Sequence, residues 1–199
     1  MDDALLVLLL TAAACAPLGV FLILRRLSMM ADAISHTVLL GIVLAFFVTH
    51  DLGSPWLLFG AALMGVVTVS LVELLGKTRL VKYDDAIGVI FPLLFALAVI
   101  LISKYAGNAH LDTDMVLMGE VIYAGLNTVG IGGVEIPAAA LKMGGLALLI
   151  AVFITVFYKE LKVSAFDGEY ARLIGVPTGI LFYAFMSLTS LTTVAAFDA

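Results

Sequence analysis

The stretch LSMMADAISHTVLLGIVLAFFV, residues 27–48, decides the fold. The apolar run at 36–49 is too short to cross a bilayer as a helix, since a crossing takes about 20 residues. A membrane-spanning helix here must therefore include residues 27–35, and with them Asp32. The carboxylate of Asp32 and the imidazole of His36 then lie four residues apart inside a membrane segment.

The composition of the whole chain also indicates a membrane protein. Of its 199 residues, 63% are hydrophobic and 13% are charged, and the mean hydropathy is +1.20, whereas soluble domains carry about 25% charged residues. We predict an all-α fold, a polytopic transmembrane helical bundle that forms one domain over residues 1–199. The other five spanning helices are expected in the apolar runs 4–24, 55–76, 86–103, 137–158 and 177–197.

Basic residues indicate how the helices are oriented. Eight of the ten Lys and Arg residues lie on one side of the predicted bundle: Arg25, Arg26, Lys77, Arg79, Lys82, Lys159, Lys162 and Arg172. Because cytoplasmic loops carry an excess of basic residues, this side is predicted to be cytoplasmic. The stretch 107–137 is then external, and its glycine-rich sequence favours irregular backbone or a short helix folded back against the bundle. No basic surface suggests nucleic acid as a partner.

Asp32 and His36 share a face of the predicted helix, because residues at i and i+4 lie one above the other. Ionisable groups in a membrane segment cost roughly a few kcal/mol each unless they pair or face a polar pathway. A carboxylate and an imidazole at this spacing are able to chelate a divalent first-row metal ion. The alternative is a mutual hydrogen bond between the two side chains at the cytoplasmic end of the helix.

The external stretch HLDTDMVLMGE, residues 110–120, offers further metal ligands. His110, Asp112 and Asp114 together would attract a cation at its point of entry. A solvated acidic loop, with Asp114 as a helix N-cap, is the alternative for the two aspartates.

Glu120 differs from these residues because its neighbours are apolar, and a carboxylate in such surroundings needs a partner. One cation shared by Asp32, His36 and Glu120 accounts for all three groups. We therefore predict that they form a transient metal site. Metal transfer should weaken at acidic pH, because a protonated imidazole does not bind metal.

The cytoplasmic stretch FDGEYARLIGVP, residues 166–177, predicts a short helix that ends at a glycine and is presented as a docking surface. It resembles the EAA…G signature of the coupling loop in ABC-importer permeases. The resemblance implies that this loop contacts an ATPase subunit. The residues that it assigns to coupling are Phe166, Asp167, Glu169, Tyr170, Ala171, Arg172 and Gly175.

Further segments resemble the metal-transporting ABC permeases of the ABC-3 family, over nearly the whole chain. These are LRRLSMMADAISHTVLLGIVLA, YDDAIGVIFPLLFALAVILIS, HLDTDMVLMGEV, FYKELKVSAFDGEYARLIGVP and LTSLTTVAAFDA. The family's helix-borne aspartate and histidine fall on Asp32 and His36, and its acidic position after the external stretch falls on Glu120. Family members continue past the position of Ala199, so we expect this chain to lack their C-terminal helices.

The resemblance implies a multi-pass permease of the bacterial cytoplasmic (inner) membrane that imports a divalent transition metal, with manganese (Mn2+) favoured. Its partners would be a second permease copy or a paralogue, cytoplasmic ATPase subunits, and an extracellular or periplasmic metal-binding protein. The chain would be no enzyme and would hold no permanent cofactor, because ATP is hydrolysed on a separate subunit and this sequence has no GxxxxGK[ST] motif. Zinc and iron(II) are alternative cargoes, and an ion-coupled secondary metal carrier is the alternative from another class.

Overall fold

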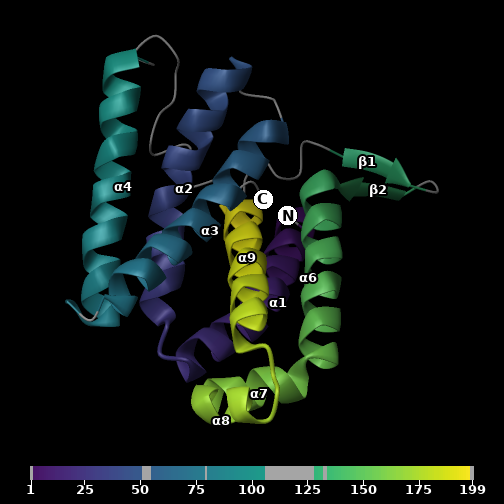
Figure 1. Ribbon diagram of the computed structural model, residues 1–199. Helices are drawn as coiled ribbons and strands as arrows, with labels where there is room; N and C mark the ends of the chain where they lie inside the picture. The colour runs from purple at the N-terminus through teal and green to yellow at the C-terminus, as the bar shows by residue number, and fades with distance from the viewer. Residues whose placement is uncertain (1, 51–54, 79, 106–127, 132–133, 198–199) are drawn as a thin grey trace. The chain divides into compact units, whose positions relative to one another are not determined.

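The computed structural model describes residues 2–50, 55–78, 80–105, 128–131 and 134–197, and most of these residues are helical (Figure 1). The elements in chain order are α1 (Asp2–Leu24), α2 (Ser28–Thr49), α3 (Pro55–Lys77), α4 (Tyr83–Tyr105), β1 (Thr128–Ile131), β2 (Val134–Pro137), α6 (Ala138–Val156), α7 (Tyr158–Phe166), α8 (Gly168–Leu173) and α9 (Thr178–Phe197).

Six of the described helices are long and apolar enough to cross a membrane, namely α1, α2, α3, α4, α6 and α9. The chain is therefore a multi-pass membrane protein, as its apolar runs predict. The second span begins at Ser28, which confirms that it takes in Asp32 together with the apolar run that follows. A helix is favoured in each span because it pairs the backbone N–H and C=O groups without help from water.

The polar segments differ from the expected structure in two places. Part of the stretch predicted to be external forms an antiparallel hairpin, in which Thr128 pairs with Pro137 and Ile131 with Val134. This part of the sequence is rich in β-branched residues, which favour extended backbone over the irregular or helical backbone that was expected. The stretch predicted to be cytoplasmic holds two short helices, and α7 follows α6 after a break at Phe157 (φ −100°, ψ 19°).

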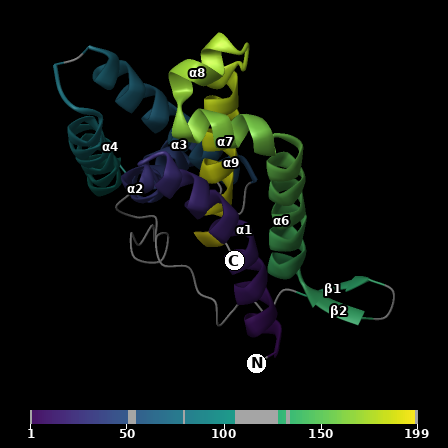
Figure 2. The same cartoon turned by 90° about the horizontal axis from the view of Figure 1, so that it is seen from below.

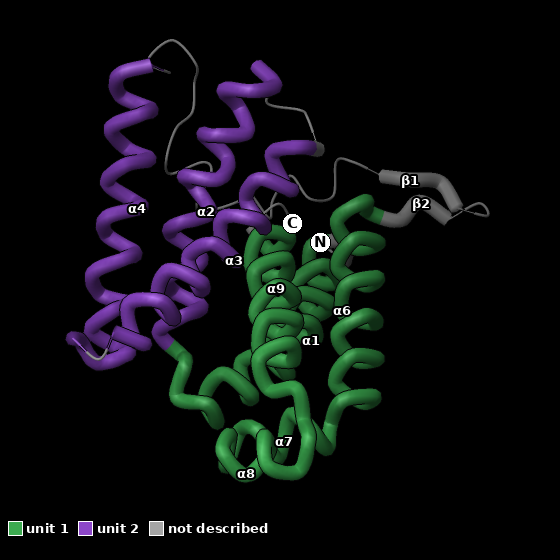
Figure 3. Tube along the Cα trace, viewed as in Figure 1, with its two compact units in different colours: residues 1–28, 119–199 green, residues 29–118 purple. Residues whose placement is uncertain are grey.

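The chain forms two compact units, which are described separately. Unit 1 comprises residues 1–28 and 119–199, and unit 2 comprises residues 29–118 (Figure 3). In unit 1, α1 packs along α6 and also contacts α9. The helices α7 and α8 lie at one end of α6, and the hairpin lies at its other end (Figures 1 and 2). Whether the whole chain acts as one permease domain stays a prediction.

The helices of unit 1 pack against one another and bury apolar side chains. Among the fully buried side chains are Val7 of α1, Met143 and Ile150 of α6, Leu161 of α7 and Phe185 of α9. Two buried hydroxyls of α9 bond to their own helix: Thr189 Oγ1 donates to the carbonyl of Phe185 at 2.9 Å, and Thr192 Oγ1 donates to that of Leu188 at 2.7 Å. Such back-bonding allows a hydroxyl to lie in an apolar core without a partner on another helix.

In unit 2, small residues bring α2 and α3 into close contact. A Cβ atom added to Gly41 would lie against the carbonyl oxygen of Gly60 and 2.7 Å from Cβ of Met64. Beside this contact, the buried hydroxyls of Thr37 and Thr68 are 2.8 Å apart. Lipid tails are as apolar as leucine, so close backbone packing and hydrogen bonds of this kind hold membrane helices together.

We predict that Gly41→Ala destabilises the protein, because the new methyl group would overlap atoms of α3. Overpacking of this kind costs about 1–3 kcal/mol, which thermal unfolding in detergent would detect as a lower midpoint. Gly88→Ala in α4 is the matched control, since a Cβ atom there meets nothing within 4 Å. Equal midpoints for the two variants would contradict the close packing of α2 on α3.

Candidate metal and coupling sites

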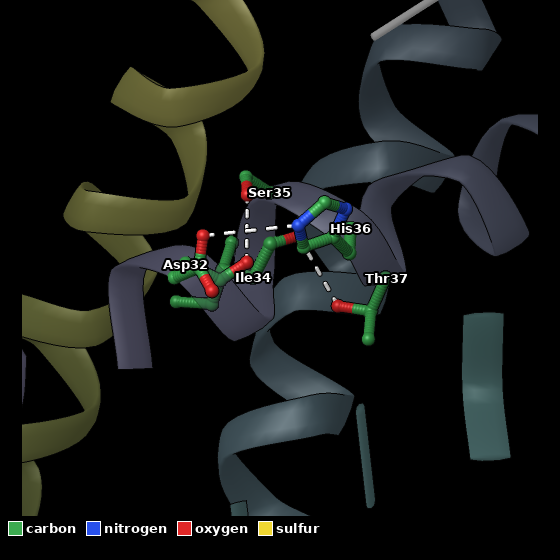
Figure 4. A network of polar contacts seen from close by, with 5 residues as sticks. All are labelled: Asp32, Ile34, Ser35, His36 and Thr37. Atoms are coloured by element: carbon green, nitrogen blue, oxygen red, sulfur yellow. Dashed lines mark hydrogen bonds and ion pairs between the residues drawn. The ribbon is translucent and has the colours of Figure 1, made fainter. Parts of the chain in front are cut away.

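Asp32 and His36 lie on one face of α2, about 6 and 12 Å along the helix axis from Ser28 at 1.5 Å per residue. Oδ1 of Asp32 and Nε2 of His36 are 3.7 Å apart (Figure 4). This distance is longer than a hydrogen bond. It is close to the roughly 3–3.5 Å between two ligand atoms that each lie about 2.1 Å from one metal ion.

The surroundings leave both groups available to a ligand. The side chains of Asp32 and His36 are 63% and 40% exposed. The hydroxyl of Ser35 donates to the backbone carbonyl of Asp32 at 2.6 Å, and that of Thr37 donates to the carbonyl of Ile34 at 3.2 Å. These neighbouring hydroxyls therefore donate to the backbone of α2 and not to the Asp32 carboxylate or the His36 imidazole (Figure 4).

Two aromatic residues of α4 hold the imidazole of His36. Its ring centroid is 5.6 Å from that of Phe91, with the planes inclined by 30°, and 5.7 Å from that of Phe95, with an edge-on inclination of 75°. Residues 91 and 95 are one helical turn apart, so both rings project from the same face of α4. Contact with two rings restricts the rotation of the imidazole while its Nε2 atom faces Asp32.

The other predicted metal ligands lie outside the described residues. These are His110, Asp112, Asp114 and Glu120. Within the ranges that the structure describes, no three His, Cys, Asp or Glu side chains gather at one point. Of the predicted metal ligands, Asp32 and His36 are thus the two that lie among the described residues. The contribution of Glu120 stays a prediction.

The predicted coupling segment forms the short helix α8, which has a defined start and end. The carboxylate of Asp167 caps the start by accepting from the amides of Glu169 and Tyr170, at 3.0 and 2.9 Å. At the end, Gly175 has a φ of 87°. Its amide donates to Arg172, and the next amide, of Val176, donates to Ala171, which is a Schellman motif. The prediction that a glycine ends this helix is confirmed.

Large apolar side chains are exposed around α8, at one end of unit 1. Phe166 and Leu173 are 73% and 85% exposed, and Tyr170 and Ile174 are more than half exposed. Ala171, in contrast, is fully buried, so the helix is attached by one face and presents the other. The guanidinium of Arg172 also donates to the hydroxyl of Thr178, at 3.0 Å, which joins the end of α8 to the start of α9.

Several residues that contact the candidate sites, or the helix next to them, from another part of the chain carry no signal of this in the sequence. Phe91 and Phe95 contact His36, and their spacing in the sequence shows only that they share a face. Arg25 indicates only the topology by its charge, yet its side chain reaches α7. Neither contact can be inferred from spacing, because spacing does not say which helices are neighbours.

The fold and these sites define a class: a polytopic membrane protein with a short helical segment exposed at one end of unit 1. The chain belongs to the ABC 3 transport family, whose model matches residues 1–199. It is 44% identical over 197 residues to the zinc transport system membrane protein TroD of Treponema pallidum, and 47% identical over 191 residues to the manganese transport system membrane protein MntD of Bacillus subtilis.

These alignments take in 99% and 96% of this chain but 54% and 64% of the two relatives. The chain therefore spans between about half and just under two thirds of their lengths. Its fold is similar to that of PsaBC from Streptococcus pneumoniae, solved in complex with a Fab, with a TM-score of 0.74 and 28% identity over 99% of this chain and 65% of that one.

We predict that Gly175→Val loosens the end of α8. A β-branched residue at positive φ costs about 1–2 kcal/mol, and because a Cβ atom here meets nothing within 4 Å, strain is the whole effect. The measurement is hydrogen exchange at the amide of Val176, which should become several-fold faster. Gly175→Asn should have a smaller effect, because asparagine tolerates this region.

Gly179→Val is the matched control for this experiment. Gly179 also has open space around its Cβ position, but its backbone does not need a positive φ. Unchanged exchange at Val176 in Gly175→Val would show that the left-handed turn does not hold the end of the helix.

Proposed function

We propose that the chain is a permease subunit of an ABC importer that carries a divalent transition metal across the bacterial cytoplasmic membrane. The observation that carries this proposal is the pair formed by Asp32 and His36 on one face of a spanning helix. The family match over residues 1–199 supports it. The permease would be no enzyme, since ATP would be hydrolysed on partner subunits.

The proposed metal site has few protein ligands. Asp32 supplies one carboxylate oxygen and His36 one ring nitrogen, at a separation that suits a shared ion. Glu120 is proposed to complete the site, and His110, Asp112 and Asp114 to attract the ion before it arrives. Few protein ligands and exposed side chains favour release, which a transporter needs as much as binding.

Manganese is the proposed cargo, with zinc and iron(II) as the alternatives. One carboxylate from Asp32, a second from Glu120 and one imidazole suit manganese, iron(II) and zinc alike. Relatives named for zinc and for manganese transport are about equally similar to this chain. Metal content of a deletion strain, with each metal supplied in turn, decides among them: the cargo is the metal whose cellular content falls.

The exposed segment around α8 is proposed to dock on a cytoplasmic ATPase. Its capped start, its glycine end and its exposed apolar residues provide a rigid surface of the kind that a partner buries. ATP binding on the partner would then shift the permease between outward-facing and inward-facing states. A second permease copy or a paralogue, and an external metal-binding protein, are the other proposed partners.

The first functional prediction concerns the metal site itself. Asp32→Ala, His36→Ala and Glu120→Ala should each abolish metal uptake, because each removes one ligand of a site that has few. Asp32→Asn should fail nearly as completely, since the amide keeps the shape of the carboxylate but not its charge. Uptake of 54Mn by cells, corrected for the amount of permease in the membrane, is the measurement.

Ser35→Ala is the matched control, because Ser35 lies between the two ligands in the sequence and its hydroxyl bonds to the backbone carbonyl of Asp32. It should transport normally. Normal uptake by the Asp32 and His36 variants, or a loss explained entirely by missing permease, would show that the pair is structural. Uptake by vesicles that needs an ion gradient and no ATP would favour the secondary carrier.

The second functional prediction concerns the aromatic contacts of His36. Phe91→Leu should reduce the apparent affinity for metal roughly three- to tenfold, because such ring contacts contribute about 0.5–1.5 kcal/mol. The maximal rate and the ATPase rate should change little. Leu93→Ala, at a 62% exposed position of α4, is the control. An affinity equal to that of the wild type would show that Phe91 does not orient the imidazole.

A further inference from the structure

The end of α1 places an arginine at a defined point of unit 1. Arg26 has a φ of 57°, and its amide donates to the carbonyl of Ile23 at 2.9 Å. The amide of Leu27 donates to the carbonyl of Leu22 at 2.8 Å. These bonds form a Schellman motif with buried leucines at both ends. The turn fixes Arg25, the residue immediately before it.

The side chain of Arg25 contacts two other helices of unit 1. Its Nη2 atom donates a hydrogen bond to the hydroxyl of Ser164 in α7. Its guanidinium carbon lies 5.7 Å from the ring centroid of Phe185 in α9, a cation–π distance. Phe185 is fully buried and meets Phe21 of α1 edge-on at 6.2 Å. Arg25 thus joins α1 and α9 to the helix that leads into the proposed docking segment.

The partly buried position of the Arg25 guanidinium is unfavourable for a positive charge, because water solvates it there only in part. Arg26, the next residue, is exposed, whereas Arg25 is partly buried and its burial lowers the pKa of the guanidinium. A long side chain at a helix end normally extends to water. The Nε atom of Arg25 is buried and has no hydrogen-bond partner among the described residues, so the contacts with α7 and α9 leave part of its donor capacity unused.

A carboxylate with an unused acceptor lies on the same face of α7. Glu160 is one helical turn before Ser164, so the two side chains are neighbours on that helix. Its Oε2 atom is buried and, within the described part of the chain, has no hydrogen-bond partner. Two acceptors of different strength therefore lie one turn apart on α7: the hydroxyl of Ser164, which Arg25 contacts, and the carboxylate of Glu160, which it does not contact.

We propose that Arg25 is a positioning residue that transmits movement of α7 to α1 and α9, by exchanging Ser164 for Glu160 as its partner. A shift of α7 by about one turn, roughly 5 Å, would bring the carboxylate to the place of the hydroxyl. This inference rests on the proposed function, since the movement would come from an ATPase docked on the neighbouring α8. Arg25 is not one of the proposed metal ligands and acts through α7 and α9.

The test uses the complete transporter with its ATPase subunits and metal-binding protein in proteoliposomes, supplied with Mn2+. Arg25→Met should retain the bound ATPase and its rate of ATP hydrolysis within about twofold, while metal transported per ATP falls at least about fivefold. Glu160→Gln should act in the same direction. The double variant should be no worse than Arg25→Met alone, because both changes remove one interaction.

Arg26→Asn is the matched control, because it removes the same charge at the next residue and asparagine tolerates the left-handed turn. It should transport like the wild type. The inference is overturned if Arg25→Met transports normally per ATP, if it loses the ATPase subunits, or if the two defects multiply in the double variant. A wild-type complex without ATP-driven transport would instead refute the proposed function, and the inference with it.

Discussion

Backbone hydrogen bonding in a medium without water is the constraint on which the rest of this structure depends. Each unpaired N–H or C=O group in hydrocarbon costs several kcal/mol, so the six apolar segments all form helices. Departures from helical backbone occur between the spans, at Phe157, at Arg26 and at Gly175. The functional candidates are found near these departures or on the few polar residues inside the spans.

Association of the helices rests on a second consequence of the same medium. Because lipid already surrounds apolar side chains, helices gain little from hiding them and associate through close packing and polar contacts. Gly41 against Gly60 and Thr37 beside Thr68 provide this in unit 2. In unit 1, Arg25 with Ser164 and Phe185 provides a polar contact at the end of the spans. The contact made by Arg25 is also the one that we propose to transmit movement of α7.

The ends of α1 and α8 in unit 1 both form a Schellman motif, with different consequences. The turn after α8 has glycine at its positive φ, which lets the helix stop abruptly beside exposed apolar residues. The turn after α1 has arginine there, held by buried leucines, and it directs the neighbouring Arg25 toward α7. Both turns lie at one end of unit 1, where α7 and α8 are also found (Figures 1 and 2).

The sequence by itself determined the membrane class, the six spans, the family and the helix that ends at Gly175. Each of these depends on local properties, namely the length of an apolar run, the spacing of residues on one helix, or a glycine at a helix end. It also placed Asp32 and His36 on one face of α2. Only the tertiary structure decided that Phe91 and Phe95 contact His36 and that Arg25 reaches α7. Those contacts join residues far apart in the chain, and in lipid no periodic pattern in the sequence specifies which helices become neighbours.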